Sequence, residues 1–393
     1  MARLRCRAGC LLGEKSLQPF DLTIVGASFA GLVCARTAAL RGLRVAVIEA
    51  KPDAGARLHT TGIMVKEAAE EVDIPAQLTR KVRGVRLYAP SLRSLDLFAP
   101  GYYFLATDTA GVLRWLAAEA QRAGVQIYYD LRFTGAEGRD GGWRLAEPPI
   151  ETRFLLGADG ARSRVAKALG LGRNERFLTG VEAEFPLLPE IDDRFLHCFL
   201  DSRLAPGYLA WIVPGLGLTQ AGLAVRSGDK PDLAGFLDKV GGRFGLAGRQ
   251  PLGRRAGLIP VGGPVEPLWR PGALLVGDAA GLVSPLTAGG IQLAYRFGRR
   301  AAQLVADHLQ DGGGEPGRLL ERELPRFRTK HLLRRGLDLA PPAAMIETAL
   351  RFGVTRRLAQ EIFFHRRGSD DPEAYERFLE SQRKGGPAYG NGG

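Results

Sequence analysis

Residues 21–50 constrain the fold more than any other stretch of the chain, because they read as strand, turn, helix and strand. The first apolar strand is predicted over residues 22–25 and a glycine-containing turn follows it. The next segment carries apolar residues at helical spacing up to Gly42, where a C-terminal cap belongs. A β-branched strand over residues 44–48 completes a unit typical of dinucleotide-binding folds.

Four residues of this unit have the properties that dinucleotide binding requires. Gly26 permits a tight turn, and Gly31 lets the helix pack close to the strand, so the helix N-terminus can face a pyrophosphate. Ser28 stands where a middle glycine is usual. Glu49 follows Gly26 at about the 20-residue spacing that brings an acid to a ribose hydroxyl. The alternative is a strand–helix–strand unit without a ligand, but the joint register favours a dinucleotide.

Composition places the chain among ordinary globular proteins of two or three domain-sized units. It has 393 residues, of which 45% are apolar and 24% are charged. No apolar run reaches the roughly 18–20 residues that span a bilayer, so no transmembrane helix is predicted. The four cysteines, Cys6, Cys10, Cys34 and Cys198, are expected to be free thiols. Such usage is typical of a reducing cytosol, and we expect a cytoplasmic protein.

A net charge of +12 favours anionic partners, namely a phosphorylated cofactor, anionic lipid headgroups or nucleic acid. No nucleic-acid motif accompanies the charge, so no nucleic-acid partner is expected. Two interpretations remain open, a solvated basic surface and a surface that contacts a membrane.

A second glycine-flanked turn lies within residues 153–169. There an apolar strand runs into Gly157, Asp159 and Gly160, and a helix is predicted to begin near Ser163. The Asp159 side chain has two candidate roles, contact with a cofactor and capping of that helix.

A third strand-to-helix connection lies within residues 273–302 and again ends in a glycine-rich helix start. Its free N–H groups suit a large cofactor with many acceptors. Six candidate contact residues belong to it: Gly277, Asp278, Pro285, Gly289, Gly290 and Ile291.

The remaining segments alternate between strand and helix patterns. Helices are predicted over 63–80, 109–123 and 232–248, and Thr109 is a candidate N-cap of the second. Short strands are predicted within 81–107, 125–134, 143–145, 177–226 and 252–259.

These motifs together resemble the FAD-dependent superfamily of p-hydroxybenzoate hydroxylase-like monooxygenases, flavin halogenases and geranylgeranyl reductases. The resemblance covers roughly residues 20–310. It implies that the first motif holds the ADP half of FAD and that Asp159 contacts the pyrophosphate region. It also implies that Asp278 holds the ribitol and that the N–H groups at Gly289–Ile291 face the flavin pyrimidine. The full set of cofactor-contact candidates is Gly26, Ser28, Gly31, Glu49, Arg57, Asp159, Gly277, Asp278, Pro285, Gly289, Gly290 and Ile291.

The resemblance implies an α/β fold: a Rossmann-like FAD-binding domain of the glutathione reductase-like ββα variant, interleaved with an antiparallel-sheet substrate domain and followed by a helical C-terminal tail. The expected parts are a disordered extension over 1–20, the FAD-binding domain over 21–80, 108–175 and 265–310, the substrate domain over 81–107 and 176–264, helices over 311–384 and a disordered end over 385–393.

Within the superfamily, the third motif is most similar to that of the geranylgeranyl reductases. The segment 207–214 resembles their YxWxFP motif, so Tyr208 and Trp211, together with Thr60, are candidates to line a substrate cavity. The chain departs from that pattern in four places, one of which is Gly215, where a lysine commonly follows the proline. Tyr208 and Trp211 are one residue further apart, Thr60 and Thr61 stand where a cysteine is frequent, and Thr109 takes the place of a flavin-contacting arginine.

The implied activity is reduction of carbon–carbon double bonds in a prenyl lipid by reduced FAD, with a hydrophobic small molecule or lipid as substrate. No second glycine fingerprint is present, so NAD(P)H or another carrier is expected to bind transiently. Two alternatives remain. One is a monooxygenase that hydroxylates an aromatic or polyketide substrate, and the other is a non-catalytic prenyl-binding protein with a flavin fold.

The basic segment 310–380 is expected to be helical, with apolar residues every fourth position. They are Ile346, Leu350, Val354, Leu358 and Ile362. Packing of this stripe against the body is favoured over peripheral membrane contact by the basic C-terminal helices.

Overall fold

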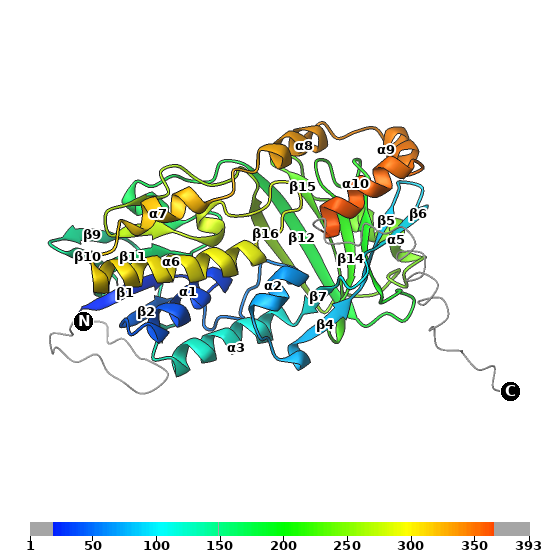
Figure 1. The fold of residues 1–393 in the computed structure, drawn as a ribbon. Coiled ribbons are helices and arrows are strands. Elements are labelled where there is room, and N and C mark those ends of the chain that lie inside the picture. The colour runs from blue at the N-terminus through cyan, green and yellow to red at the C-terminus, as the bar shows by residue number, and fades with distance from the viewer. Residues whose placement is uncertain (1–18, 148, 365–393) are drawn as a thin grey trace.

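The computed structural model describes residues 19–147 and 149–364, and Figure 1 shows them as an elongated molecule. One end is built around the sheet that contains β1 and β11, and the other around the sheet that contains β12 and β15. The sequence predicted a disordered extension and a disordered tail. Residues 1–18 and 365–393, on which these predictions fall, lie outside the described residues.

The first sheet is the Rossmann-like layer, with the strand order β17-β18-β11-β1-β2-β8 and a β9–β10 hairpin beside β11. The run from β18 to β8 is parallel, which is the expected consequence of helical crossovers. Its strands are β1 (Phe20–Val25), β2 (Val45–Ile48), β8 (Gln126–Tyr128), β9 (Ala136–Arg139), β10 (Gly142–Leu145), β11 (Glu151–Gly157), β17 (Trp269–Arg270) and β18 (Ala273–Leu275).

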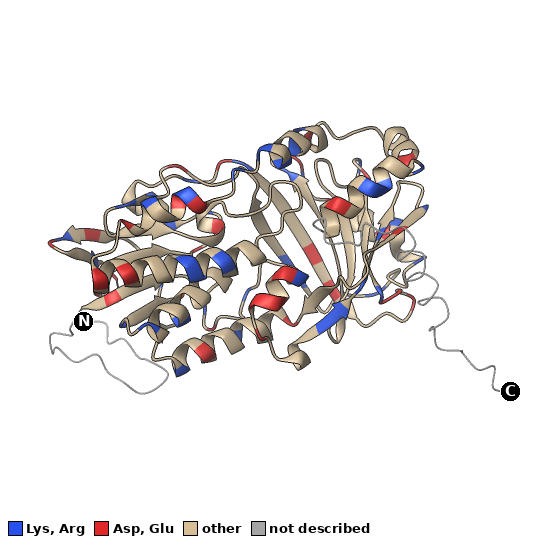
Figure 2. Ribbon diagram, viewed as in Figure 1, with Lys and Arg blue, Asp and Glu red and all other residues tan. Residues whose placement is uncertain are grey.

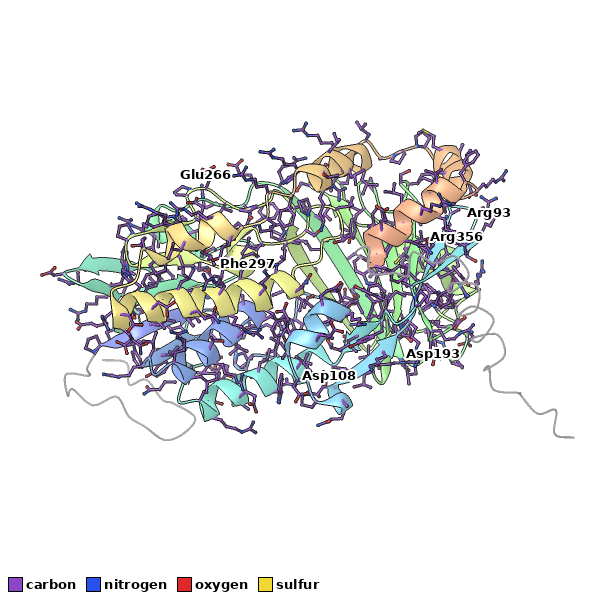
Figure 3. The ribbon with its side chains drawn as sticks, in the orientation of Figure 1. Arg93, Asp108, Asp193, Glu266, Phe297 and Arg356 are labelled. Carbon is purple, nitrogen blue, oxygen red and sulfur yellow. The ribbon has the colours of Figure 1, made fainter. Side chains whose placement is uncertain are left out.

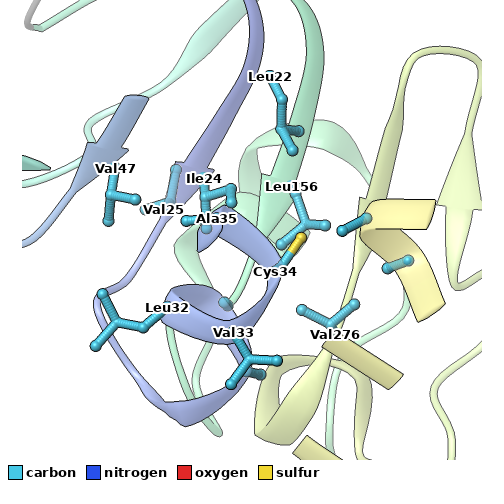
Figure 4. Close-up of a cluster of buried hydrophobic side chains, with 14 of the residues drawn as sticks. Leu22, Ile24, Val25, Leu32, Val33, Cys34, Ala35, Val47, Leu156 and Val276 are labelled. Atoms are coloured by element: carbon cyan, nitrogen blue, oxygen red, sulfur yellow. The ribbon is translucent and has the colours of Figure 1, made fainter. Parts of the chain in front are cut away.

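Three helices cover this sheet, and α1 packs against both of the others. They are α1 (Phe29–Leu40), α3 (Thr109–Arg122) and α6 (Ile291–Asp311). Figure 4 shows part of the apolar cluster between β1 and α1, in which Ile24 of β1 lies beside Ala35 of α1. The short elements α4 (Arg164–Leu169) and η2 (Gly277–Ala280) follow β11 and β18.

The second sheet has the order β16-β12-β15-β14-β13-β5-β6 and is antiparallel apart from the parallel pair β5–β13. Its strands are β5 (Gly84–Tyr88), β6 (Ser94–Phe98), β12 (Phe177–Pro186), β13 (Phe195–Phe199), β14 (Ala210–Pro214), β15 (Leu218–Arg226) and β16 (Gly253–Pro260). Helix α5 (Leu233–Gly241) packs on β15.

The third sheet has three strands, and two short helical segments connect two of them. It consists of β3 (Ile63–Val65), β7 (Phe104–Thr107) and β4 (Thr79–Val82), with α2 (Lys66–Glu71) and η1 (Ala76–Leu78) between β3 and β4. Four helices follow α6: α7 (Pro316–Glu323), α8 (Arg328–Asp338), α9 (Ala343–Ala349) and α10 (Gly353–Phe364).

The predicted fold class is confirmed, but several local predictions are wrong. Residues 63–80 do not form one helix, because Pro75 interrupts the chain and Thr79–Val82 pairs as a strand. Nor do residues 131–134 form a strand, since β9 begins at Ala136. Asp108, labelled in Figure 3, caps α3 by accepting from the Gly111 N–H, so Thr109 is not the N-cap.

Two further differences concern the predicted parts of the chain. Phe20 already belongs to β1, one residue inside the predicted extension. The strand β7 lies in the segment expected in the substrate domain, yet it pairs with β3 and β4.

Helices α1 and α6 approach each other so closely that glycine is required at the contact. A Cβ atom at Gly298 of α6 would lie 2.6 Å from the carbonyl oxygen of Ala30, well inside any normal contact. Phe29 and Tyr295 pack beside this point, with ring centroids 5.6 Å apart.

We therefore predict that Gly298→Ala lowers the free energy of unfolding by about 1–3 kcal/mol, because backbone must shift to accommodate the methyl group. Gly336→Ala is the matched control: Gly336 lies in α8 with nothing near its Cβ position, so it should gain up to ~1 kcal/mol from helix propensity. Urea unfolding of both variants checks the contrast. Equal effects would contradict the close α1–α6 approach.

Candidate active site

The first-motif turn is compressed to the point where two glycines are obligatory. Gly26 has φ +107°, and a Cβ atom there would lie 2.4 Å from the Ala158 carbonyl oxygen. At Gly31 the same atom would lie 2.0 Å from the Gly26 carbonyl oxygen. The first motif thus packs directly on the second. Ser28 and Ala158, which meet at this contact, are 130 residues apart in the sequence.

Ser28 has a specific role at this junction. It is the N-cap of α1, where its hydroxyl accepts from the Gly31 N–H at 3.3 Å and donates to the Ala158 carbonyl at 3.1 Å. The serine therefore both caps the helix and ties the two motifs together. The remaining N–H groups of the first turn have no partner within the helix and carry the positive end of its dipole.

Glu49 is buried at the end of β2 and anchors the same turn. Its Oε2 accepts from the Ala27 N–H at 2.8 Å and its Oε1 from the Lys51 N–H at 2.9 Å. Each carboxylate oxygen retains acceptor capacity, so a ligand hydroxyl can still bind.

Of the two roles considered for Asp159, the structure shows the capping of α4. Its carboxylate accepts from the Ser163 hydroxyl at 2.6 Å and from the N–H groups of Arg164 and Val165 at 2.6 and 3.1 Å. Burial raises the pKa of Asp159, and these donors partly offset that rise. The carboxylate thereby fixes the start of α4 behind the turn that carries Ala158.

Asp278 is the opposite case, a carboxylate without a donor. It follows β18 and is half-buried, and within the described ranges its side chain accepts no hydrogen bond. Burial raises the pKa of Asp278 to about 6. A Cβ atom at Gly290 would lie 3.3 Å from its Oδ1, so the carboxylate faces the start of α6.

The start of α6 is open to a ligand. Gly290 is its N-cap without a side-chain cap, and the first turn holds no acidic residue. The preceding loop is stabilised by a hydrogen bond from the Ser284 N–H to the Gly289 carbonyl and by buried Pro285. Ala288 has φ +51°, a strained value for alanine, so the surrounding contacts hold this loop in place.

A buried carboxylate that the sequence did not single out, Glu182 of β12, ties the segment before β3 to the second sheet. Its Oε2 accepts from the Thr61 hydroxyl and from the Trp211 indole N–H, both at 2.7 Å. Its Oε1 accepts from Arg255 Nε at 2.6 Å. Glu182 thus fixes the segment containing Thr60 against the second sheet.

An apolar wall joins the second sheet to the loop before α6. Its members are Leu178, Tyr208, Trp211, Ala224, Ile259, Val261 and Ala288. The Tyr208 hydroxyl donates to the Thr287 carbonyl at 2.6 Å, and burial raises the pKa of Tyr208, so its proton stays in this bond. The wall therefore borders the glycine-rich start of α6.

The structure brings most of the predicted residues together and leaves others aside. Gly277, with φ +59°, meets Ala30, because a Cβ atom there would lie 2.8 Å from the Ala30 Cβ. Arg57 is exposed with φ +46°, and within the described part of the chain its guanidinium donates only to the Ala50 carbonyl, at 3.4 Å. Thr109 is buried against Thr107, with 3.0 Å between their hydroxyls. Glu182 was not identified from the sequence. Its position between Val181 and Ala183 in a predicted strand could have indicated a buried acid.

Comparison with known proteins places these features in context. A family described as an NAD(P)-binding Rossmann-like domain matches residues 24–88. A digeranylgeranylglycerophospholipid reductase of Methanothrix thermoacetophila is 32% identical over 318 residues, covering 74% of this chain and 79% of that protein. The protein of the same name from Methanocaldococcus jannaschii is 28% identical over 330 residues, covering 79% and 83%.

Solved structures show the same fold. A geranylgeranyl bacteriochlorophyll reductase-like protein of Thermoplasma acidophilum superposes with a TM-score of 0.77 at 21% identity, covering 92% of this chain and 99% of that one. PqsL of Pseudomonas aeruginosa, a probable FAD-dependent monooxygenase, has a TM-score of 0.64 at 19% identity, covering 84% and 100%.

The residues present fit FAD. The α1 start with Glu49 suits a pyrophosphate and a ribose hydroxyl, and the donor-free Asp278 suits ligand hydroxyl groups. The uncapped start of α6 suits an acceptor-rich ring. We propose that these three elements hold the cofactor of this FAD-dependent enzyme.

On this assignment, Asp278→Asn should weaken FAD binding roughly tenfold to a hundredfold, because bonds to an ionised acceptor are the stronger ones. Asp311→Asn, at the exposed far end of α6, should leave the affinity unchanged. Titration of the flavin-free protein with FAD, followed by flavin fluorescence, measures both.

The affinity of the unmodified protein should also depend on pH. Hydroxyl donors favour the ionised carboxylate, so FAD binding is full above about pH 6 and weakens as the pH falls below it. Asp278→Asn should flatten this dependence. If the variant keeps the pH dependence of FAD binding, a group other than Asp278 causes it.

Proposed function

Because this chain belongs to the digeranylgeranylglycerophospholipid reductase family, we propose that it saturates carbon–carbon double bonds of a prenyl lipid. It is an FAD-dependent oxidoreductase, and reduced FAD supplies the hydride for such a reaction. NAD(P)H or another carrier is the transient reductant.

The observation that carries the proposal is the apolar wall beside the cofactor loop. Ala288 belongs both to that wall and to the loop before α6, and Tyr208 bonds to the preceding Thr287. A prenyl chain lying on the wall would therefore have its double bonds next to the helix start. Tyr208, Trp211, Ile259 and Ala288 are its partly exposed members and offer apolar contact, which suits a substrate recognised by shape and hydrophobicity.

The residues of the chain have distinct duties in this proposal. The N–H groups at the start of α6 stabilise negative charge in a site from which the wall excludes water. Tyr208 acts as a positioning residue, because its proton is committed to Thr287. Glu182 holds Trp211 and Thr61 and so sets the distance between the wall and the cofactor loops.

A second function, hydroxylation by a flavin monooxygenase, is favoured by the shared fold with PqsL. The two activities differ in their need for oxygen. A prenyl reductase works without it, whereas a monooxygenase consumes it with each turnover.

The test is incubation of the reduced protein with a geranylgeranyl lipid under strict anaerobic conditions, followed by lipid extraction and mass spectrometry. We expect mass gains corresponding to added hydrogen pairs on the prenyl chains. Unchanged lipids without oxygen, together with hydroxylation of a small aromatic in air, would replace the reductase proposal with the monooxygenase.

We further propose that α8, α9 and α10 contact a membrane surface containing anionic lipids. Six of the ten exposed large apolar side chains of the described residues lie on or beside these helices: Leu332, Leu339, Met345, Phe352, Val354 and Leu358. Basic positions accompany them on α8 and α10, as Figure 2 shows. Within the described residues no helix is both long and apolar enough to cross a bilayer.

The packing of α10 supports this surface. The helix packs on the body through Ala359, Phe363 and Phe364, and Arg93, labelled in Figure 3, ties α9 down by donating to Glu347. Val354 and Leu358, two members of the predicted packing stripe, are instead 78% and 46% exposed. Apolar side chains exposed beside arginines are typical of interfacial helices.

We predict that replacing Met345, Phe352 and Val354 by serine reduces binding to anionic phospholipid vesicles at least tenfold, because each side chain loses apolar burial. The control replaces Leu40, Leu187 and Leu252, which are similarly exposed elsewhere. Vesicle co-sedimentation checks both. Equal losses in the two triple variants would show that no particular face binds.

A further inference from the structure

Helix α8 carries a buried guanidinium that the fold alone does not satisfy. Arg334 is 0% exposed, and its Nε and Nη2 face Asp338 Oδ1 at 3.0 and 2.9 Å. The Nη2 contact is an ion pair, and neither Nη1 nor Nη2 has a hydrogen-bond acceptor among the described residues. A buried, incompletely paired cation is costly, so it is expected where positive charge has a use.

The position of Arg334 relates it to the proposed substrate wall. Its guanidinium carbon lies 6.0 Å from the ring centroid of Tyr208, on the wall. Tyr208 in turn bonds to Thr287 beside the start of α6. Arg334 of α8 thus lies beside the Tyr208 member of the wall.

A basic hollow opens on the outer side of the same helix. It is lined by Arg176, Arg326, Arg328, His331, Leu332 and Arg335. The His331 ring packs against Gly263, because a Cβ atom there would lie 2.9 Å from His331 Nε2. The hollow therefore offers cationic side chains around a recess.

The charge of the hollow is not balanced by carboxylates. Asp338 serves two cations at once, Arg334 through Oδ1 and Arg176 through Oδ2 at 3.2 Å. Arg326, Arg328 and Arg335 have no carboxylate partner in the part of the chain that the structure describes. Burial, reinforced by the charges of Arg176 and Arg335, lowers the pKa of His331.

We propose that this hollow binds the phosphate of a prenyl lipid headgroup, backed by the buried charge of Arg334, while the prenyl chain enters along the wall. The inference rests on the proposed function and deepens it. Guanidinium groups suit phosphate because they donate in a planar fork. The location also fits, because α8 is part of the surface proposed to contact the membrane, from which a lipid headgroup would arrive.

The test compares binding of geranylgeranyl phosphate and geranylgeraniol to the FAD-loaded protein by calorimetry. We expect the phosphate to bind at least tenfold more tightly, since charge-assisted hydrogen bonds are among the strong ones. The double variant Arg328→Gln with Arg335→Gln should lose that ratio and keep the affinity for the alcohol. Both residues are exposed, so the fold should persist.

The matched control is Arg132→Gln with Arg144→Gln, which removes the same charge from exposed sites near the β9–β10 hairpin and should keep the ratio. Inorganic phosphate is the third probe. If it binds as tightly as geranylgeranyl phosphate, the hollow is a site for the free anion and the headgroup assignment is overturned.

The outcomes also separate this inference from the function on which it rests. Equal binding of alcohol and phosphate would refute the headgroup site and leave the prenyl reductase proposal standing. Failure of both prenyl ligands to bind would contradict both.

Discussion

The structure depends on one crowded point, the first turn of α1, where segments from four parts of the chain approach without room for a side chain. Gly31 packs tightly against Gly26, and Gly26 packs tightly against Ala158. Gly277 and Gly298 both pack tightly against Ala30. Because three of these four glycines meet backbone and Gly277 meets the Ala30 methyl group, α1 and α6 are held rigidly together at the edge of the parallel sheet where doubly wound folds bind their ligands.

A second constraint, the buried carboxylate of Glu182, transmits this geometry to the other sheet. It binds Thr61 from the segment after the first motif, Trp211 from β14 and Arg255 from β16. Removing any one partner would leave a buried charge or donor unsatisfied, which is the costly case. The cofactor edge and the apolar wall are therefore positioned together, and this relation makes the arrangement suited to delivering a prenyl chain to a flavin.

Local patterns predicted the cofactor edge because each motif carries its own signal. The glycines at 26, 31 and 277 stand where close approach or a left-handed backbone requires them, and a strand precedes each turn. The helix over residues 63–80 failed because the break at Pro75 and the pairing of β4 with β7 outweigh local helix propensity. The roles of Glu182 and Arg334 could not be predicted, since Trp211, Arg255 and Tyr208 are brought to them only by tertiary packing.

The central claim is that three motifs separated by more than two hundred residues form a single FAD site. The most direct measurement is the identity and amount of flavin released from the purified, FAD-reconstituted protein after denaturation. Chromatography should detect FAD equimolar with the chain. A protein that stays colourless after reconstitution, or that retains FMN in place of FAD, would contradict the account.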